Sequence, residues 1–129
     1  MSPRRVAVVP HTHWDREWYA TFEAFRARLV PLLDGLLDLL ESDPAYAYFL
    51  LDGQLAVVED YLAVRPGAEP RLRRLVESGR VAVGPWYTLP DEFCVSGSDS
   101  RRSRRSSSSG TSPARKASNV AYHSRSQWV

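Results

Sequence analysis

The chain has 129 residues, 43% of them apolar and 11% aromatic, which suits one domain that buries a hydrophobic core. Its net charge of +2 joins two unlike parts: residues 1–100 hold 10 basic and 15 acidic residues, whereas residues 101–129 hold seven basic residues and no acidic one. We expect a cytoplasmic protein, because the sequence has neither an apolar run that could span a membrane nor the apolar core of a signal peptide, and the single cysteine, Cys94, excludes an internal disulfide.

The first half of the chain alternates between strand and helix patterns. Val6–Val9 is a β-branched run ended by Pro10, which predicts a buried strand. From Thr21 to Glu41 apolar residues recur every three or four positions, which predicts an amphipathic helix. Tyr46–Leu51 is rich in aromatic and aliphatic residues and predicts a second strand.

The same alternation continues to about residue 96. Gln54–Val64 predicts a helix, Pro70 marks the start of a shorter helix, and Val81–Val83 predicts a third strand. Strands that alternate with helices imply parallel strands with helical crossovers, so the predicted fold class is α/β. Because the carboxyl ends of parallel strands share one edge, the loops His11–Trp18 and Gly84–Phe93 are expected to lie together.

The composition changes abruptly after this region. Residues 98–129 are rich in Arg and Ser and contain no Leu, Ile, Met or Phe, so they have nothing to place in a core. We therefore divide the chain into a folded part, residues 1–97, and a disordered tail, residues 98–129. Arg101–Arg105 is typical of a basic arm that contacts nucleic acid, although a tail without function is the better interpretation.

Metal-ligating residue types are densest directly after the first predicted strand. His13 and Asp15 occupy alternate positions there, so both side chains would point the same way and could converge on one cation. Imidazole nitrogen with carboxylate oxygen suits zinc or a similar divalent ion. His11 could join them or could brace the loop. The alternative is that these histidines are ordinary surface residues.

Aromatic and acidic side chains gather on the same predicted edge. An exposed Trp such as Trp18 can be a flat platform for a sugar ring, although core packing also explains one or two of these aromatic residues. The loop Gly84–Phe93 adds Trp86 and Asp91. Asp91 could bind hydroxyl groups or act as an acid or base, or it could simply cap a helix or lie in a solvated turn. Weaker candidates follow the second strand, where Asp52 begins an Asp-Gly-Gln sequence common in turns.

Taken together, these motifs resemble the N-terminal region of the glycoside hydrolase family 38 α-mannosidases, most closely the bacterial type. The resemblance covers roughly residues 5–97, and the matching stretches are Val8–Tyr19, Leu51–Gln54 and Gly84–Phe93. It implies an N-terminal α/β barrel with zinc, or another divalent ion, at its mouth. It also implies hydrolysis of terminal α-mannosides with retention of configuration.

The resemblance also assigns roles by motif position. His13 and Asp15 would be metal ligands, with His11 left as support. Trp18 would stack on the sugar, and Trp86 and Asp91 are further candidates for substrate binding. The expected partner is an α-mannoside or a mannosylated oligosaccharide, with no membrane and no nucleic acid.

The sequence departs from the family pattern after Ser96. No segment of this chain matches the stretch that holds the family's catalytic aspartate or the later histidine ligand, so we assign no catalytic residue and expect an incomplete metal site. The change to Arg and Ser suggests a frameshifted tail, from about Ser98, on a truncated and inactive mannosidase that holds only the first three strands and helices of the barrel.

Two alternative functions remain open. One is a non-catalytic binding module whose basic tail contacts nucleic acid or a partner. The other is a different metal-dependent barrel hydrolase, such as an amidohydrolase, since these enzymes also carry a His-x-His sequence after their first strand.

Overall fold

The computed structural model describes residues 4–89 and 96–97. The predicted roles of Asp91 and of the tail, residues 98–129, therefore lie outside the described residues. The elements, in chain order, are α1 (Phe22–Ser42), β1 (Phe49–Leu50), α2 (Ala56–Val64), a 3-10 turn η1 (Pro66–Ala68), α3 (Glu69–Glu77) and β2 (Val81–Ala82). None of the helices in these ranges has the length and apolar character needed to cross a membrane.

The sheet is small and parallel. β1 pairs with β2, with Phe49 opposite Val81. On the other edge of β1, the N-terminal segment forms a parallel bridge between His11 and Leu50. The Leu50 amide donates to the Pro10 carbonyl over 3.0 Å, and Leu50 in turn accepts from the amide of Thr12 over 3.3 Å. The predicted α/β class with parallel pairing is confirmed, and β1 lies between the two other segments.

The predicted buried strand Val6–Val9 is wrong in this structure. The segment is extended but lies outside the hydrogen-bonded sheet, and Val6 and Val8 are 85% and 87% exposed. A β-branched run is buried only where another layer covers it, and no described element covers these valines. Pairing with β1 begins only at Pro10.

The other predicted elements are present with adjusted ends. α1 begins where expected, because the Thr21 side chain accepts from the Ala24 amide and caps the helix. The strands are shorter than predicted. α2 begins at Ala56 rather than Gln54, since the backbone amide of Gln54 closes a turn onto the Leu51 carbonyl over 3.2 Å.

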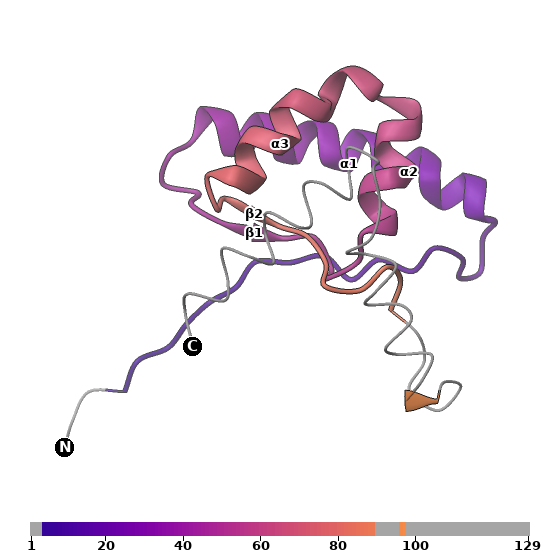
Figure 1. Ribbon diagram of the computed structural model, residues 1–129, viewed down its shortest axis with the longest axis horizontal. Coiled ribbons are helices and arrows are strands. Elements are labelled where there is room, and N and C mark those ends of the chain that lie inside the picture. The colour runs from indigo at the N-terminus through magenta and orange to yellow at the C-terminus, as the bar shows by residue number, and fades with distance from the viewer. Residues whose placement is uncertain (1–3, 90–95, 98–129) are drawn as a thin grey trace.

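The three helices form a layer on one face of the strands (Figure 1). α1 contributes leucines at helical spacing, among them Leu29, Leu33 and Leu37, each 1% exposed. These side chains pack against α2 and α3 as well as the strands. Burial of this apolar surface is the main stabilising contribution to the fold.

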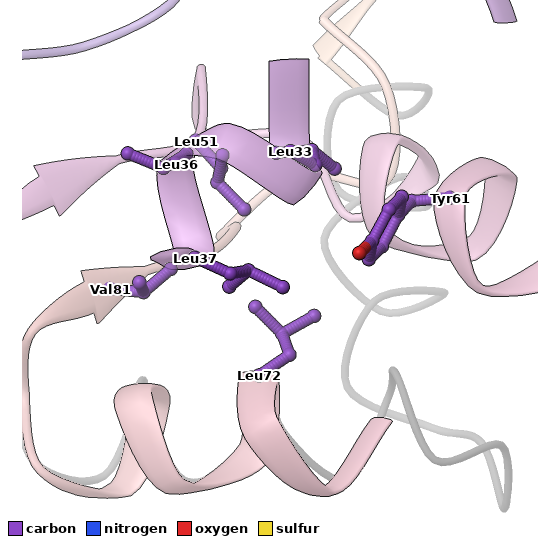
Figure 2. A pocket seen from close by; sticks show the side chains of 7 residues that line it. All are labelled: Leu33, Leu36, Leu37, Leu51, Tyr61, Leu72 and Val81. Carbon is purple, nitrogen blue, oxygen red and sulfur yellow. The ribbon is translucent and has the colours of Figure 1, made fainter. Parts of the chain in front are cut away.

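Figure 2 shows the centre of this core, where apolar side chains from the helix layer and the strands converge. The space between them does not admit a water molecule. It is therefore part of the packed interior rather than a ligand site. The lining residues are Leu33, Leu36, Leu37, Leu51, Tyr61, Leu72 and Val81.

Polar contacts join the helices at the rim of the core. The Tyr61 hydroxyl on α2 donates to Asp34 Oδ1 on α1 over 2.7 Å, and Arg65 Nε lies 3.3 Å from Asp34 Oδ2. The hydrogen bond from Tyr61 is the main cause that holds the pKa of Asp34 below its usual range. In the same way, Arg71 on α3 lowers the pKa of Glu41 on α1. These contacts fix the helices relative to one another.

Tyr61→Phe tests the contact between α1 and α2. The lowered pKa of Asp34 contributes stability that is complete above the unfolded-state pKa and is lost as pH falls through the folded-state pKa. We expect the variant to lose about 1 kcal/mol of unfolding free energy at neutral pH. The difference from the wild type should shrink in acid, as urea unfolding at several pH values would show.

Tyr46→Phe is the matched control, because Tyr46 also packs on the core but does not contact Asp34. If Tyr61→Phe loses the same unfolding free energy in acid as at neutral pH, this account of Asp34 is wrong.

Candidate functional site

The loop after Pro10 presents alternate residues to solvent. His11, His13 and Asp15 are exposed, whereas Thr12, Trp14 and Arg16 are half-buried. This alternation is that of an extended backbone, whose successive side chains point to opposite sides. The predicted candidate ligands therefore share the solvent-facing side of the loop.

Two half-buried side chains anchor the loop on the helix layer. The Trp14 ring packs edge-on against Phe25 of α1, with 5.8 Å between ring centroids. Arg16 donates two hydrogen bonds to Asp60 of α2, over 3.0 and 3.1 Å, and its guanidinium lies 4.8 Å from the centre of the Phe22 ring. A bidentate pair of this kind fixes orientation as well as position.

The turn after β1 holds the loop from the other side. Asp52 and Gly53 both have positive φ, 43° and 70°, a backbone conformation that Asp-Gly sequences favour. The side chain of Asp52 is only 7% exposed, and its Oδ2 accepts from the Trp14 amide over 2.8 Å. The Nε2 group of buried Gln54 donates to the same oxygen and, over 2.9 Å, to the Trp14 carbonyl.

The same turn also holds the loop after β2. The Trp86 amide donates to the Gly53 carbonyl over 3.1 Å, and the Trp86 carbonyl accepts from the Leu55 amide over 2.9 Å. The Leu89 amide donates to Gln54 Oε1 over 3.3 Å. The three loops that follow the parallel segments therefore meet at one edge, as the sequence predicted.

His13 and Asp15 lie close enough to share one cation. His13 Nε2 is 3.6 Å from Asp15 Oδ1. Two ligand atoms about 2.1 Å from a tetrahedral zinc ion would lie about 3.4 Å apart, so the pair fits zinc with a small adjustment. Within the part of the chain that is described, no group of three or more His, Cys, Asp or Glu side chains could hold a metal. The described residues thus offer two ligands rather than a closed site.

The structure places the other candidate residues at different positions on this edge. Trp18 is 63% exposed and packs edge-on against Tyr19, with 5.1 Å between ring centroids. Trp86 is half-buried in the loop after β2. His11 is exposed, and its Nδ1 lies 2.8 Å from the Thr12 carbonyl oxygen. Trp18 therefore offers an open aromatic face, whereas Trp86 is partly enclosed.

The residues that sequence reasoning ranked too low are those that hold the loops. Their sequence predicts turn residues, yet Asp52 bonds to the loop after Pro10 and Gln54 bonds to the loop after β2. The Asp-Gly-Gln sequence was a partial signal for this role. No local sequence pattern indicates the role of Asp60, because its partner Arg16 lies 44 residues away in the sequence.

The sequence of this chain is similar to those of known proteins. Residues 3–104 match the model of the glycosyl hydrolases family 38 N-terminal domain. A protein of Halalkalibacterium halodurans named "Putative mannosylglycerate hydrolase" is 46% identical over 89 residues, which are 69% of this chain and 10% of that protein.

Two solved structures are also similar. An alpha-mannosidase from Enterococcus faecalis V583 matches with 43% identity and a TM-score of 0.71, and a glycosyl hydrolase family 38 protein from Enterococcus faecalis matches with 38% identity and a TM-score of 0.67. Each match covers 74% of this chain and 11% of the other chain. The chain thus spans about a tenth of the length of the relatives it matches.

Gln54→Leu tests whether the buried amide holds the loops together. The change keeps the size of the side chain but removes its hydrogen bonds, which leaves buried polar groups near Trp14 and Leu89 without their partner. We expect a loss of about 1–3 kcal/mol in unfolding free energy. Hydrogen exchange at the Leu89 amide should accelerate.

The backbone-only bond from the Leu55 amide to the Trp86 carbonyl is the internal control and should stay protected. Unchanged exchange at Leu89 would contradict the role of Gln54.

Proposed function

The chain belongs to glycosyl hydrolase family 38, and on this premise we propose that it supplies the cation-binding and mannoside-binding edge of an α-mannosidase. The observation that carries the proposal is the pair His13 and Asp15, exposed side by side at the carboxyl end of the sheet. Among its relatives, one is named a putative mannosylglycerate hydrolase and another an alpha-mannosidase, which supports the substrate class.

In this proposal, His13 and Asp15 hold zinc or another divalent cation. Imidazole nitrogen and carboxylate oxygen are ligands that zinc accepts. When bound, the cation would attract sugar hydroxyl groups and support distortion of the ring. His11 supports the loop through its backbone pairing with Leu50 rather than as a ligand.

Aromatic and acidic residues would bind the sugar. Trp18 offers an exposed ring face on which the C–H groups of a mannose ring can stack. Trp86 and Asp91, from the aromatic and acidic loop Gly84–Phe93, are further candidates for substrate binding. The substrate class is a terminal α-mannoside, which includes a mannosylated oligosaccharide or a mannosylglycerate.

Hydrolysis with retention needs a carboxylate nucleophile and a general acid. We assign neither to any residue of this chain, so the proposal includes no mannosidase activity for the 129 residues alone. We also propose that the described layer is the first part of an α/β barrel, and that the protein acts in the cytoplasm.

Zinc titration of the 129-residue chain tests the cation site. We expect weak binding, because two ligands are fewer than the three or four that zinc sites normally have. His13→Ala and Asp15→Ala should each lower the zinc affinity by more than about tenfold. A loss of roughly tenfold is typical of removing a residue that only orients a metal ligand. Isothermal titration calorimetry measures these affinities.

His11→Ala is the matched control, because it removes an exposed imidazole from the same loop and should leave the affinity unchanged. Equal losses in His11→Ala and His13→Ala would contradict the assignment of His13.

Activity is tested with an aryl α-mannoside and with mannosylglycerate in the presence of added zinc. We expect no turnover of either substrate by the 129-residue chain, because no residue is assigned as the nucleophile. Turnover that Asp15→Ala abolishes would overturn this expectation and would place a complete active site within the chain.

A further inference from the structure

Asp52 is an enclosed carboxylate close to His13 of the candidate cation site. Its side chain is 7% exposed and lies at the carboxyl end of β1. One oxygen, Oδ2, accepts hydrogen bonds from the Trp14 amide and from Gln54 Nε2. These two donors fix the carboxylate plane, so the position of the second oxygen is also fixed.

That second oxygen faces His13. Asp52 Oδ1 lies 3.9 Å from His13 Nδ1, while the other ring nitrogen, Nε2, lies 3.6 Å from Asp15 Oδ1. The imidazole therefore lies between two carboxylates that differ in their exposure to solvent. The side chain of Asp15 is 46% exposed, whereas that of Asp52 is almost fully enclosed.

We propose that Asp52 is a positioning residue that keeps the neutral imidazole of His13 protonated at Nδ1 and leaves Nε2, on the side of Asp15, free to bind a cation. The enclosed charge of Asp52 acts through a lower effective dielectric constant than the solvated charge of Asp15, so it dominates the choice of tautomer. A histidine that binds a metal usually donates its other N–H to such a carboxylate. The part that concerns the cation rests on the proposed function, whereas the tautomer of His13 does not.

Asp52→Asn separates this role from the role of Asp52 in the turn. The amide oxygen of asparagine can still accept from the Trp14 amide and from Gln54, so the loop should remain anchored. The amide NH₂ group would then take the place of Oδ1 and would face His13 Nδ1 as a donor. In the variant, a hydrogen-bond donor therefore faces His13 in place of an acceptor. The contacts that hold the loop are preserved.

The experiment uses the full 129-residue chain labelled with ¹⁵N. Long-range ¹H–¹⁵N spectra at alkaline pH report which ring nitrogen carries the proton in each neutral histidine, and His13→Ala assigns the signals. We expect the Nδ1–H form of His13 in the wild type and the Nε2–H form in Asp52→Asn. Zinc affinity, measured in parallel, should fall about tenfold or more in the variant.

Asp34→Asn is the matched control, because it also neutralises a carboxylate that joins two elements, yet Asp34 contacts Tyr61 and Arg65 rather than the loop. It should change neither the tautomer of His13 nor the zinc affinity. Slow hydrogen exchange at the Trp14 amide in Asp52→Asn would show that the loop anchor is intact.

The possible outcomes separate the inference from the proposed function. An Nε2–H tautomer of His13 in the wild type would overturn the inference whether or not the variant folds, and so would an Nδ1–H tautomer that persists in Asp52→Asn. A tautomer that switches in Asp52→Asn while the wild type binds no zinc would confirm the positioning by Asp52 and overturn the proposed cation site. A switch together with weaker zinc binding would support both.

Discussion

The arrangement of the edge that carries the candidate site depends on one buried polar turn. The side chains of Asp52 and Gln54 are enclosed, and unpaired polar atoms there would be costly. Asp52 Oδ2 and the Gln54 side chain form hydrogen bonds with the backbone of the loop after Pro10, and Gln54 Oε1 also accepts from the loop after β2. Because each partner belongs to a different loop, satisfying this one turn brings the candidate residues of all three segments to the same edge.

The helix layer provides the rigid support for this edge. Leucines of α1 pack against α2, α3 and the strands, and the contacts Arg16–Asp60 and Trp14–Phe25 connect the loop directly to that layer. The half-buried residues of the loop thus carry its stabilisation, and the exposed ones remain available for chemistry. The two sets of residues lie on opposite sides of the loop because successive side chains of an extended backbone point in opposite directions.

Much of the fold could be predicted because its signals are local. Helical spacing of leucines predicted α1, a threonine cap predicted its start, and Pro70 predicted the start of α3. The valines at 6–9 show the limit of such reasoning, since composition indicates that a segment can be buried but not which layer covers it. The candidate ligands His13 and Asp15 were found from their spacing, whereas Asp60 could not be found, because its pairing with Arg16 depends on how α2 packs.

Short stretches of consecutive residues predicted the α/β class and the family resemblance, and they indicated the candidate residues for a cation and a sugar. What surrounds those residues depends on how the chain packs. The tertiary structure placed His13 between a solvated and an enclosed carboxylate, and it made Asp52 and Gln54 the centre of the edge. Burial and long-range hydrogen bonds create these relations, and neither is determined before the chain has packed.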